Sequence, residues 1–428
     1  MSFMKVTLQS NRLFADLTLM LMFVSSFFLF SCATNSQAEE TERERERERL
    51  EAEYKTFRET HFEDGSPILT KDTVFEGTDS LLVTFAGDIM AHKPNWARGH
   101  YDEIYEDIAS ELQESDLAFA NMETPVCDSR DYSTYPEFNV HHEYVEASIR
   151  AGFNVFSLSN NHTNDQGLTG IKATKAWFDK KRETTKDSER PVYAAGLKQD
   201  SDGPLSYEVI EKNGWTILYA AITEILNTPN SSSYIDYIAP SKKARAAFIQ
   251  EIKQIQEKNP HDLFVLSVHC SEPEYILTVK ESQKNYYFEL LDAGVDVVWV
   301  NHPHVSKYWE IVPDENNVPR KLIFYSMGNT ISAQRTNPSW NAPETNRDYT
   351  GEGYMAQVRF QKETDGVRIV HLNPILITTY ITPNGLYVIK VLNDNLIETL
   401  KDESPRWSAY LAERKKLMEK ITGKVTWR

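Results

Sequence analysis

The segment Val295-Asp296-Val297-Val298-Trp299-Val300-Asn301-His302-Pro303-His304 joins a predicted buried strand to a polar end. Its mostly apolar half, Val295–Val300, has the length and composition of a strand covered on both faces. Proline pushes the residue before it out of the helical region, so we expect an extended backbone with the imidazoles of His302 and His304 on one side. That arrangement predicts metal chelation. The alternative is a surface loop that happens to contain two histidines.

The same order, an apolar run followed by a polar residue, recurs from Thr78 onward. The stretches between these runs have helical length and spacing, for example between Ile238 and Asn259. Alternating strands and helices predict an α/β fold with largely parallel strands. The other predicted strands, each with the polar residues that follow it, are Leu81–Ala86 with Asp88, Leu117–Ala120 with Asn121 and Glu123, Val155–Leu158 with Asn160-Asn161-His162, Ile217–Ile222 with Glu224, Leu263–Val268 with His269, and Leu322–Tyr325 with Asn329.

These polar residues all follow predicted parallel strands, and ligands of open α/β sheets bind outside the carboxyl ends of such strands. A single aspartate there caps the next helix more often than it binds metal, and Asn160–Gly167 could be an ordinary capped helix start. The set as a whole favours a metal. Ionisable groups buried close together are costly without a compensating cation, and the groups concerned are Asp88, Glu123, His162, His269, His302 and His304.

The overall composition narrows the class of protein. The chain has 428 residues, with 46 Lys plus Arg against 63 Asp plus Glu, a formal net charge of -17. An acidic surface is a poor match for a phosphate backbone, so we expect no nucleic-acid partner, although a local basic groove stays open. The three cysteines are too few for a disulfide scaffold or a cysteine-rich zinc module.

The N-terminal part is predicted to be a targeting segment followed by a stalk. Lys5 and Arg12 precede the apolar stretch Leu17–Phe30, which suits a signal peptide better than a membrane span of roughly 20 residues. Its end resembles the lipobox of bacterial lipoproteins, with Cys32 as the lipidated residue; a plain signal peptide and an uncleaved anchor are the alternatives. Residues 33–75 are rich in alternating Glu and Arg, and we expect a solvated stalk.

The ordered motifs together resemble the bacterial CapA-like capsule and poly-γ-glutamate synthesis protein family, PGA_cap, which is similar to the calcineurin-type metallophosphoesterases. The motifs are Gly87-Asp88-Ile89-Met90, Asn121-Met122-Glu123, Asn160-Asn161-His162 with Asp165 and Gly167, His269 with Glu274-Tyr275, Asn301-His302-Pro303-His304, and Tyr325-Ser326-Met327-Gly328-Asn329. The resemblance covers roughly residues 80–380. It implies a four-layer α/β/β/α sandwich, two mixed sheets flanked by helices, with one or two divalent ions of Mn, Fe or Zn at the strand ends.

The resemblance also implies roles for individual residues. Met90 stands where the phosphoesterases have a histidine, so His92 is expected to reach in instead. The expected metal ligands are Asp88, His92, Glu123, Asn161, His269, His302 and His304; the expected catalytic residues are His162 and Asp165; the expected substrate-binding residues are Asn160, Glu224, Glu274 and Asn329.

The domain boundaries follow from the same reading. We expect a signal segment at 1–32, the stalk at 33–75, the CapA-like domain at 76–392 and a helical extension at 393–428. Strands expected at 354–360, 367–379 and 386–392 would complete the second sheet. Cys127 and Cys270 follow two site strands, and they are either paired in a disulfide or two unpaired buried thiols.

Two functions of different classes remain open. The first is an exported, membrane-anchored, metal-dependent phosphoesterase-type hydrolase of capsule or cell-envelope polymer biosynthesis, acting on a phosphate ester or a poly-γ-glutamate-type polymer. The second is a non-catalytic protein that uses the same crevice to bind an envelope polymer or to assist its synthase or export proteins. Either would lie on the cell surface or the periplasmic face, held to the membrane by the lipid anchor.

Overall fold

The computed structural model describes residue 45 and residues 79–316 and 318–422. The predicted signal segment, Cys32 and almost all of the predicted stalk lie outside these residues. The elements below belong to the unit Tyr54–Arg428. No helix in the described part of the chain is long and apolar enough to cross a membrane.

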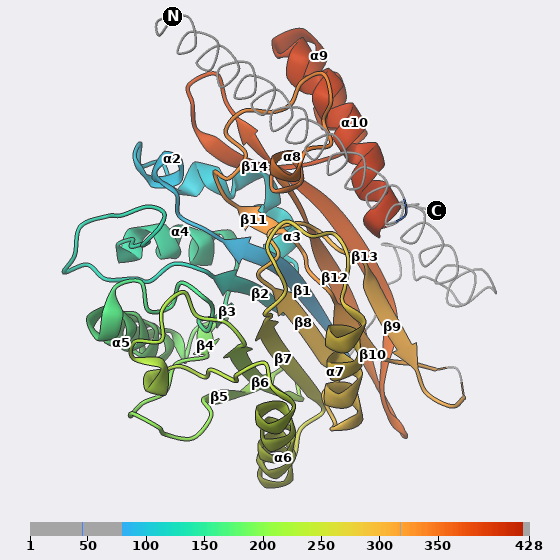
Figure 1. Cartoon of the computed structure of the whole chain (residues 1–428). Coiled ribbons are helices and arrows are strands. Elements are labelled where there is room, and N and C mark those ends of the chain that lie inside the picture. Colours follow the sequence, from blue (N-terminus) through green and yellow to red (C-terminus); the bar gives the residue numbers. More distant parts are fainter. Residues whose placement is uncertain (1–44, 46–78, 317, 423–428) are drawn as a thin grey trace, which may run out of the picture. The chain divides into compact units, whose positions relative to one another are not determined.

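The first sheet has eight strands and combines parallel with antiparallel pairs (Figure 1). Four neighbours run parallel, β1 to β4, and β12 joins the other side of β1 antiparallel, followed by β13 and β14. The short β11 adds a parallel pair to the end of β1. The strands are β1 Ser80–Ile89, β2 Leu117–Met122, β3 Val155–Ser157, β4 Tyr193–Ala195, β11 Asn329–Ile331, β12 Glu352–Glu363, β13 Gly366–Ile381 and β14 Tyr387–Val391.

The second sheet has six strands in the order β5-β6-β7-β8-β10-β9. Its central strands β6, β7, β8 and β10 are parallel, and an antiparallel strand closes each edge. The strands are β5 Tyr207–Lys212, β6 Trp215–Thr223, β7 Leu263–His269, β8 Val297–Asn301, β9 Trp309–Pro313 and β10 Pro319–Phe324.

Side-chain alternation along the strands creates the layers. On β2, Leu117 and Phe119 pack between the sheets, whereas the small Ala118 and Ala120 face a second apolar cluster on the outer side. Aromatic rings fill the space between the sheets: the ring of Phe119 lies 5.2 Å from that of Tyr219 and 5.9 Å from that of Trp299. The Trp299 indole also donates a hydrogen bond to the Ala86 carbonyl (2.9 Å), which joins β8 to β1.

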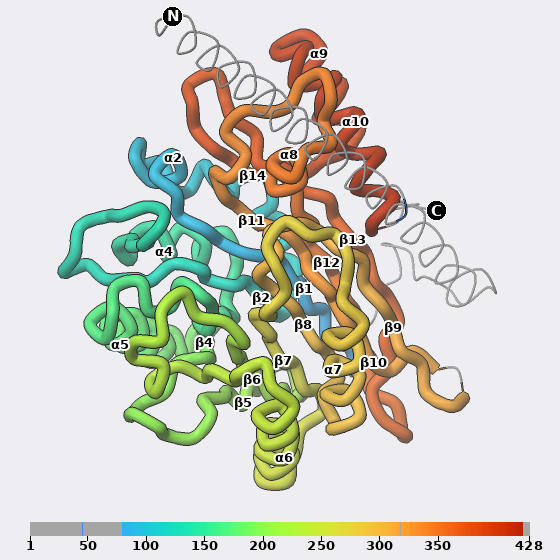
Figure 2. Tube along the Cα trace, viewed as in Figure 1, coloured from blue at the N-terminus to red at the C-terminus, as the bar shows by residue number. Residues whose placement is uncertain are grey.

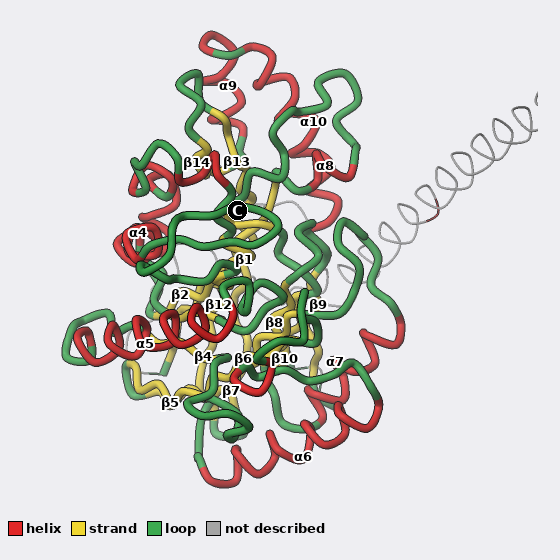
Figure 3. Tube along the Cα trace, turned by 60° about the vertical axis from the view of Figure 1, so that its left-hand side comes forward, coloured by secondary structure: helices red, strands yellow, loops and turns green. Residues whose placement is uncertain are grey.

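Helices cover both outer faces, as the tube views show (Figures 2 and 3). Buried residues of α3, α4 and α5 belong to the cluster outside the first sheet, and those of α6 and α7 to the cluster outside the second. The predicted four-layer sandwich of two mixed sheets flanked by helices is therefore confirmed. The helices are α2 Lys93–Trp96, α3 Ala109–Gln113, α4 His142–Ala151, α5 Gly167–Thr185, α6 Lys242–Lys258, α7 Glu281–Asp292, α8 Asn346–Tyr349, α9 Asp394–Glu403 and α10 Pro405–Thr422, with 3-10 turns at Asp102–Ile104, Glu106–Ile108 and Ser232–Tyr234.

The C-terminal strands lie in a different sheet from the one predicted. All three continue the first sheet from β1, with Phe85 opposite Ala356, and none joins the second sheet. Alternation identifies a strand with two different faces but not the sheet edge that it joins, which accounts for the error. The predicted helical segment forms two helices, because Pro405 begins α10 directly after the end of α9. Cys127 and Cys270 are both buried and unpaired, so the disulfide alternative is wrong.

A buried aspartate beside β6 makes a first prediction about pH. Burial raises the pKa of Asp236 from 3.8 to about 7, against the hydrogen bonds that Ser206 donates to its Oδ2. A raised carboxyl pKa means that folding favours the protonated form, so its stability contribution is lost as pH rises from about 4 to 7. Asn does not ionise, so Asp236→Asn does not lose this contribution as the pH rises. We expect the unfolding free energy of the variant, relative to that of wild type, to be about 2–3 kcal/mol higher at pH 7 than at pH 5.

Urea denaturation of both proteins at the two pH values measures this difference. Asp200→Asn, at an exposed aspartate, is the control and should show no such change. A constant difference between Asp236→Asn and wild type across this window would contradict the prediction.

Candidate metal centre

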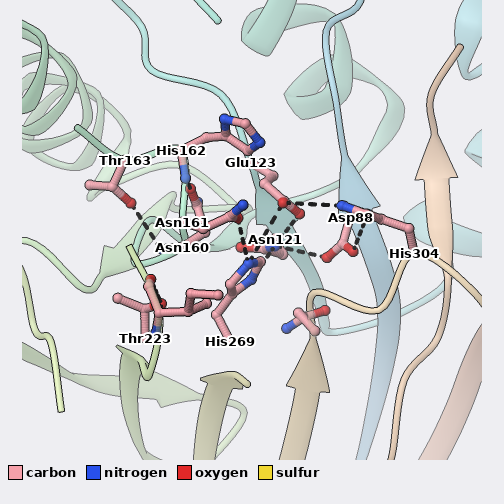
Figure 4. Close-up of polar contacts among 12 residues, drawn as sticks. Asp88, Asn121, Glu123, Asn160, Asn161, His162, Thr163, Thr223, His269 and His304 are labelled. Carbon is pink, nitrogen blue, oxygen red and sulfur yellow. Dashed lines mark hydrogen bonds and ion pairs between the residues drawn. The ribbon is translucent and has the colours of Figure 1, made fainter. Parts of the chain in front are cut away.

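The carboxyl ends of strands from both sheets meet at one edge and bring the candidate ligands together (Figure 4). Asp88, near the end of β1, is the register partner of Asn121 on β2 and of Asn329 on β11. In the second sheet, His269 at the end of β7 is the register partner of Asn301 on β8. The strand pairing therefore places residues far apart in the sequence within reach of one another, as the predicted edge requires.

Two groups of buried side chains have the composition of metal sites. The first is Glu123, His302 and His304, and the second is Asp88, Glu123 and His269; in each, one ligand atom per residue lies within 4.8 Å of the others. Glu123 belongs to both groups. Its Oε1 lies 3.6 Å from His269 Nε2 and 3.6 Å from His304 Nε2. A carboxylate shared in this way would serve as a ligand in either group, for one divalent ion or for two.

Several buried polar atoms of this centre have no hydrogen-bond partner within the described residues. They include Glu123 Oε1, Asn121 Oδ1, Asn301 Oδ1 and His302 Nδ1, whereas Asp88 Oδ2 lies 3.1 Å from His304 Nδ1. Such atoms are costly in a folded protein unless a partner satisfies them. Burial raises the pKa of Glu123 well above its usual value, and the neighbouring Asp88 and Glu274 add to the rise. The residues present therefore fit a divalent cation, which would satisfy the oxygens and return Glu123 to its ionised form.

Two of the histidines are held in the protonation state that a metal requires. Burial and the neighbouring His304 lower the pKa of His302 from 6.5 to about 4. Burial also lowers the pKa of His269 well below its usual value, with His302 and His304 adding to the effect. Neutral imidazole is the ligand form of histidine. Nitrogen and oxygen donors of this kind suit Mn, Fe or Zn alike.

Asparagines of two strands and of the loop after β3 orient the ligands. Asn121 Nδ2 donates to Asp88 Oδ1 (2.8 Å) and to Glu123 Oε2 (3.2 Å). Asn161 Oδ1 lies 2.8 Å from His269 Nε2, and Asn329 Oδ1 lies 3.1 Å from His304 Nδ1. The role of Asn121 was not predicted. The role could have been predicted from position, because Asn121 lies opposite Asp88 on the adjacent parallel strand and two residues before Glu123.

The predicted catalytic pair lies beside this centre. His162 Nδ1 lies 2.7 Å from Asp165 Oδ2, and both side chains are nearly fully buried. Burial raises the pKa of Asp165, and the hydrogen bond with His162 opposes the rise. The ring of Phe138 packs edge-on against His162 at 4.7 Å, and the Phe138 amide donates to Asp165 Oδ2. These contacts fix the orientation of the imidazole.

Two of the predicted substrate-binding residues have structural partners. Glu224 forms an ion pair with Arg245 (2.6 Å) and accepts a hydrogen bond from Gln283, so its carboxylate faces the α6 and α7 side of the second sheet. Asn160 donates to the Met122 carbonyl and accepts from the His162 amide, which shapes the loop after β3. Glu274 differs, because it lines the cavity described below. Burial alone would raise the pKa of Glu274, but His304, a hydrogen bond with Tyr275, His302 and His162 together lower it.

His92 lies at the same opening but outside both ligand groups. Its Nδ1 accepts a hydrogen bond from the Ala333 amide (3.3 Å), and burial, His304, His162 and Arg347 lower its pKa to about 3. Met90 is buried next to the opening. The structure therefore brings His92 to the site without placing it among the grouped ligands.

The backbone of the His-Pro-His loop differs from the predicted extended form. The φ angles are 105° for His302 and 57° for His304, both in the region that L-residues rarely adopt. Tertiary packing overrides the local preference for extension before proline, and each such residue costs about 1–3 kcal/mol. Even so, the two rings lie 5.9 Å apart and belong to one ligand group with Glu123. Strained residues of this kind concentrate at functional sites.

A cavity of about 620 Å³ opens onto the centre. His92, His162, His304 and Glu274 line it together with Tyr275, Gln334 and Arg347. Its size and its convergent polar groups are those of a small-molecule or chain-end binding site.

The fold and the site define an α/β sandwich with a buried carboxylate, histidine and amide centre that could hold a divalent metal. The chain belongs to the family described as Bacterial capsule synthesis protein PGA_cap, whose model matches residues 82–334, more than half of the chain.

Two CapA proteins of Bacillus are similar to 60% of this chain. The capsule biosynthesis protein CapA of Bacillus anthracis is 26% identical over 267 residues, covering 60% of this chain and 61% of that protein. The PGA biosynthesis protein CapA of Bacillus subtilis (strain 168) is 26% identical over 273 residues, covering 60% and 64%. The similarity thus spans less than two thirds of each relative. A solved calcineurin-like phosphoesterase of Bacillus subtilis superposes with a TM-score of 0.38 at 11% identity, covering 78% of this chain and 99% of that one.

Proposed function

We propose that the chain is an exported, membrane-anchored protein of capsule or envelope-polymer biosynthesis and that it is a metal-dependent hydrolase of the phosphoesterase type. Its family and the names of its relatives support the biosynthetic setting. The substrate we propose is a phosphate ester or a poly-γ-glutamate-type polymer. The anchor we propose is a lipid on Cys32, with the protein on the cell surface or the periplasmic face beside its synthase or export partners.

One observation carries the proposal of hydrolysis: an acid-base pair adjoins two ligand groups that share a carboxylate. When bound, divalent ions there would generate a nucleophile at neutral pH and stabilise charge on the reacting group. Asp88, Glu123, His269, His302 and His304 would hold them, with Asn161 next to His269. Asp165 engages His162 Nδ1, which leaves Nε2 as the nitrogen able to give a proton to the departing oxygen. Without the pair, the leaving group would depart unprotonated.

His162→Ala tests this role. We expect kcat for a phosphodiester with an unactivated alcohol as leaving group, such as a glycerophosphodiester, to fall about 10²–10⁴-fold, because general acid catalysis contributes that much. Metal content, measured by elemental mass spectrometry, should stay unchanged since His162 belongs to neither ligand group.

The matched control uses another His-Asp pair of the same chain. His142 Nδ1 lies 2.6 Å from Asp128 Oδ2, but both side chains are exposed and neither lines the cavity. His142→Ala should leave turnover at the wild-type level. If His162→Ala also keeps wild-type turnover, the proposed acid is wrong.

A second function is favoured by the Met90 position. The first strand offers Asp88 but no histidine to either ligand group, and His92 is engaged with the Ala333 amide. A centre that lacks this histidine ligand would suit a non-catalytic protein that binds an envelope polymer. In that case the purified protein would bind polymer equally well after chelator treatment and would hydrolyse no ester with added Mn or Zn.

A further inference from the structure

One cation lies in the wall of the cavity. Arg347 is the single basic residue among the described residues that line the cavity. No described carboxylate lies within ion-pair distance of its guanidinium. The chain carries a net charge of -17, and its buried arginines are paired: Arg335 and Arg414 both contact Glu352. Arg347 is exposed at the opening of the cavity and has no carboxylate partner among the described residues. Its guanidinium N–H groups are therefore available to bind a ligand.

The position of this guanidinium is fixed by an aromatic platform. Arg347 lies over the ring of Tyr275 with its Cζ 4.9 Å from the centroid, and its Nη1 lies 3.4 Å from the Tyr275 hydroxyl. Stacking on an aromatic ring holds a guanidinium in place while its N–H groups stay available in the plane. Arg347 is thus held at the wall although its side chain is exposed.

Tyr275 is in turn tied to the candidate metal centre. Its amide donates to the Pro303 carbonyl (2.9 Å), between the two histidines of the His-Pro-His loop, and its φ of 65° is a strained value. Its hydroxyl also accepts from Gln334 Nε2 (3.4 Å), and Gln334 Oε1 accepts from Asn329, which contacts His304. A continuous chain of contacts therefore sets the position of Arg347 relative to the ligand histidines.

We propose that Arg347, held on Tyr275, is a specificity-determining residue that binds an anionic group of the substrate, a carboxylate or a phosphate beyond the reacting one. This deepens the proposed function, on which it rests, by naming the residue that would recognise an anionic group of the substrate away from the reacting one. Asp88 and Glu123 belong to the candidate metal centre, and Glu274 lines the cavity. An anionic group beyond the centre is therefore attracted to Arg347, the cation in the cavity wall. Its planar fork matches either oxyanion in a bidentate manner.

Equilibrium binding tests the inference without reference to turnover. Three fluorescently labelled oligomers of equal length are titrated into the full chain in detergent, followed by fluorescence anisotropy: oligo-γ-glutamate, oligo-glycerol phosphate and the neutral oligo-γ-glutamine. We expect Arg347→Ala to weaken binding of an anionic oligomer at least about tenfold, since hydrogen bonds to charged groups have that effect. Binding of the neutral oligomer should not change. Arg347→Lys should recover only part of the loss, because lysine cannot bind in a bidentate manner.

Arg406→Ala is a matched control. Arg406 is also exposed and also stacked on an aromatic ring, with its Cζ 4.3 Å from the Trp340 centroid, but it lies on α10 and outside the cavity lining. Arg406→Ala removes the same charge and the same kind of contact as Arg347→Ala. Because Arg406 does not line the cavity, this variant should bind every oligomer as wild type does.

Each outcome decides the inference. A loss confined to oligo-γ-glutamate identifies a carboxylate ligand, a loss confined to oligo-glycerol phosphate identifies a phosphate ligand, and a loss of both identifies a general anion site. The inference is overturned if Arg347→Ala and Arg406→Ala behave alike, or if wild type binds no anionic oligomer more tightly than the neutral one. Failure of the proposed hydrolysis is seen separately, as a wild-type protein that turns over no ester with added metal.

Discussion

Glu123→Gln is expected to abolish retention of metal and to lower ester hydrolysis about 10³-fold or more. The same Oε1 lies 3.6 Å from histidine nitrogens of both ligand groups, so one substitution removes a charged ligand from each. A neutral amide is a much weaker ligand for a hard or borderline cation than a carboxylate. The loss of several kcal/mol of charge stabilisation corresponds to the expected change in rate.

Thermal stability separates loss of metal from loss of fold. Wild type should gain stability when Mn or Zn is added, by about 2.7 kcal/mol at a hundredfold excess over Kd. Glu123→Gln should show no such gain, yet it should be at least as stable as metal-free wild type. The reason is that the buried amide is neutral, whereas burial, Asp88 and Glu274 oppose ionisation of Glu123 and raise its pKa.

A buried carboxyl away from the centre is the control. Glu208 is 9% exposed and forms an ion pair with Arg182 (2.7 Å), and burial raises its pKa to about 7. Glu208→Gln should keep the metal content, the metal-induced stabilisation and the turnover of wild type. Full metal content in purified Glu123→Gln would contradict the assignment of Glu123 as a shared ligand.

The strands that carry the site could be predicted because burial on both faces leaves a simple signal. Val297–Val300 on β8 is apolar throughout, and Leu263–Val268 on β7 is apolar except for the small Ser267. Each run ends at a polar residue that the structure places at the shared edge. Strand ends at one edge of a parallel sheet lie close together, so the proximity of Asp88 and Glu123 in the first sheet followed from the pattern. Their approach to His269 in the second sheet depends on how the two sheets pack, which the pattern does not give.

Features that depend on pairing and on loop packing could not be predicted in the same way. The three-residue β11 is too short to show a periodicity, yet it pairs with the end of β1 and places Asn329 opposite Asp88. Glu224 also follows an apolar strand, but its carboxylate pairs with Arg245 of the outer helix α6 and does not line the cavity. That outcome depends on the packing of the outer helices. The same holds for the φ angles of His302 and His304, which the surrounding packing sets against local preference.

A buried cluster of charged side chains joins the helix α10 to the start of the strand β12. Glu352 at the start of β12 binds Arg335 through Oε1 and Arg414 of α10 through Oε2 (2.7 Å). All three side chains are at most 1% exposed. The Arg335 guanidinium lies where a side chain on Gly351 would be, with Cζ 1.9 Å from an ideal Cβ, so glycine at this position makes room for the cluster.

Glu352→Gln is therefore expected to destabilise the fold by about 3–5 kcal/mol, because it leaves two buried guanidinium groups without a carboxylate. Guanidinium chloride denaturation monitored by tryptophan fluorescence measures this loss. Glu413→Gln on the same α10 breaks only the exposed pair with Lys416 and should leave the denaturation midpoint unchanged.

A second substitution distinguishes buried charge from lost packing as the cause. Arg414→Met in the Glu352→Gln background removes one of the two uncompensated charges, so the double variant should be more stable than Glu352→Gln alone. If the effects of the two substitutions simply add, the charge explanation is wrong. Arg414 also donates to the Pro343 carbonyl, and Tyr410 of the same helix donates to Asp348 next to Arg347. Loss of the cluster should therefore loosen the segment that carries Arg347, and binding of anionic oligomers should weaken in Glu352→Gln at denaturant concentrations where the protein is still folded.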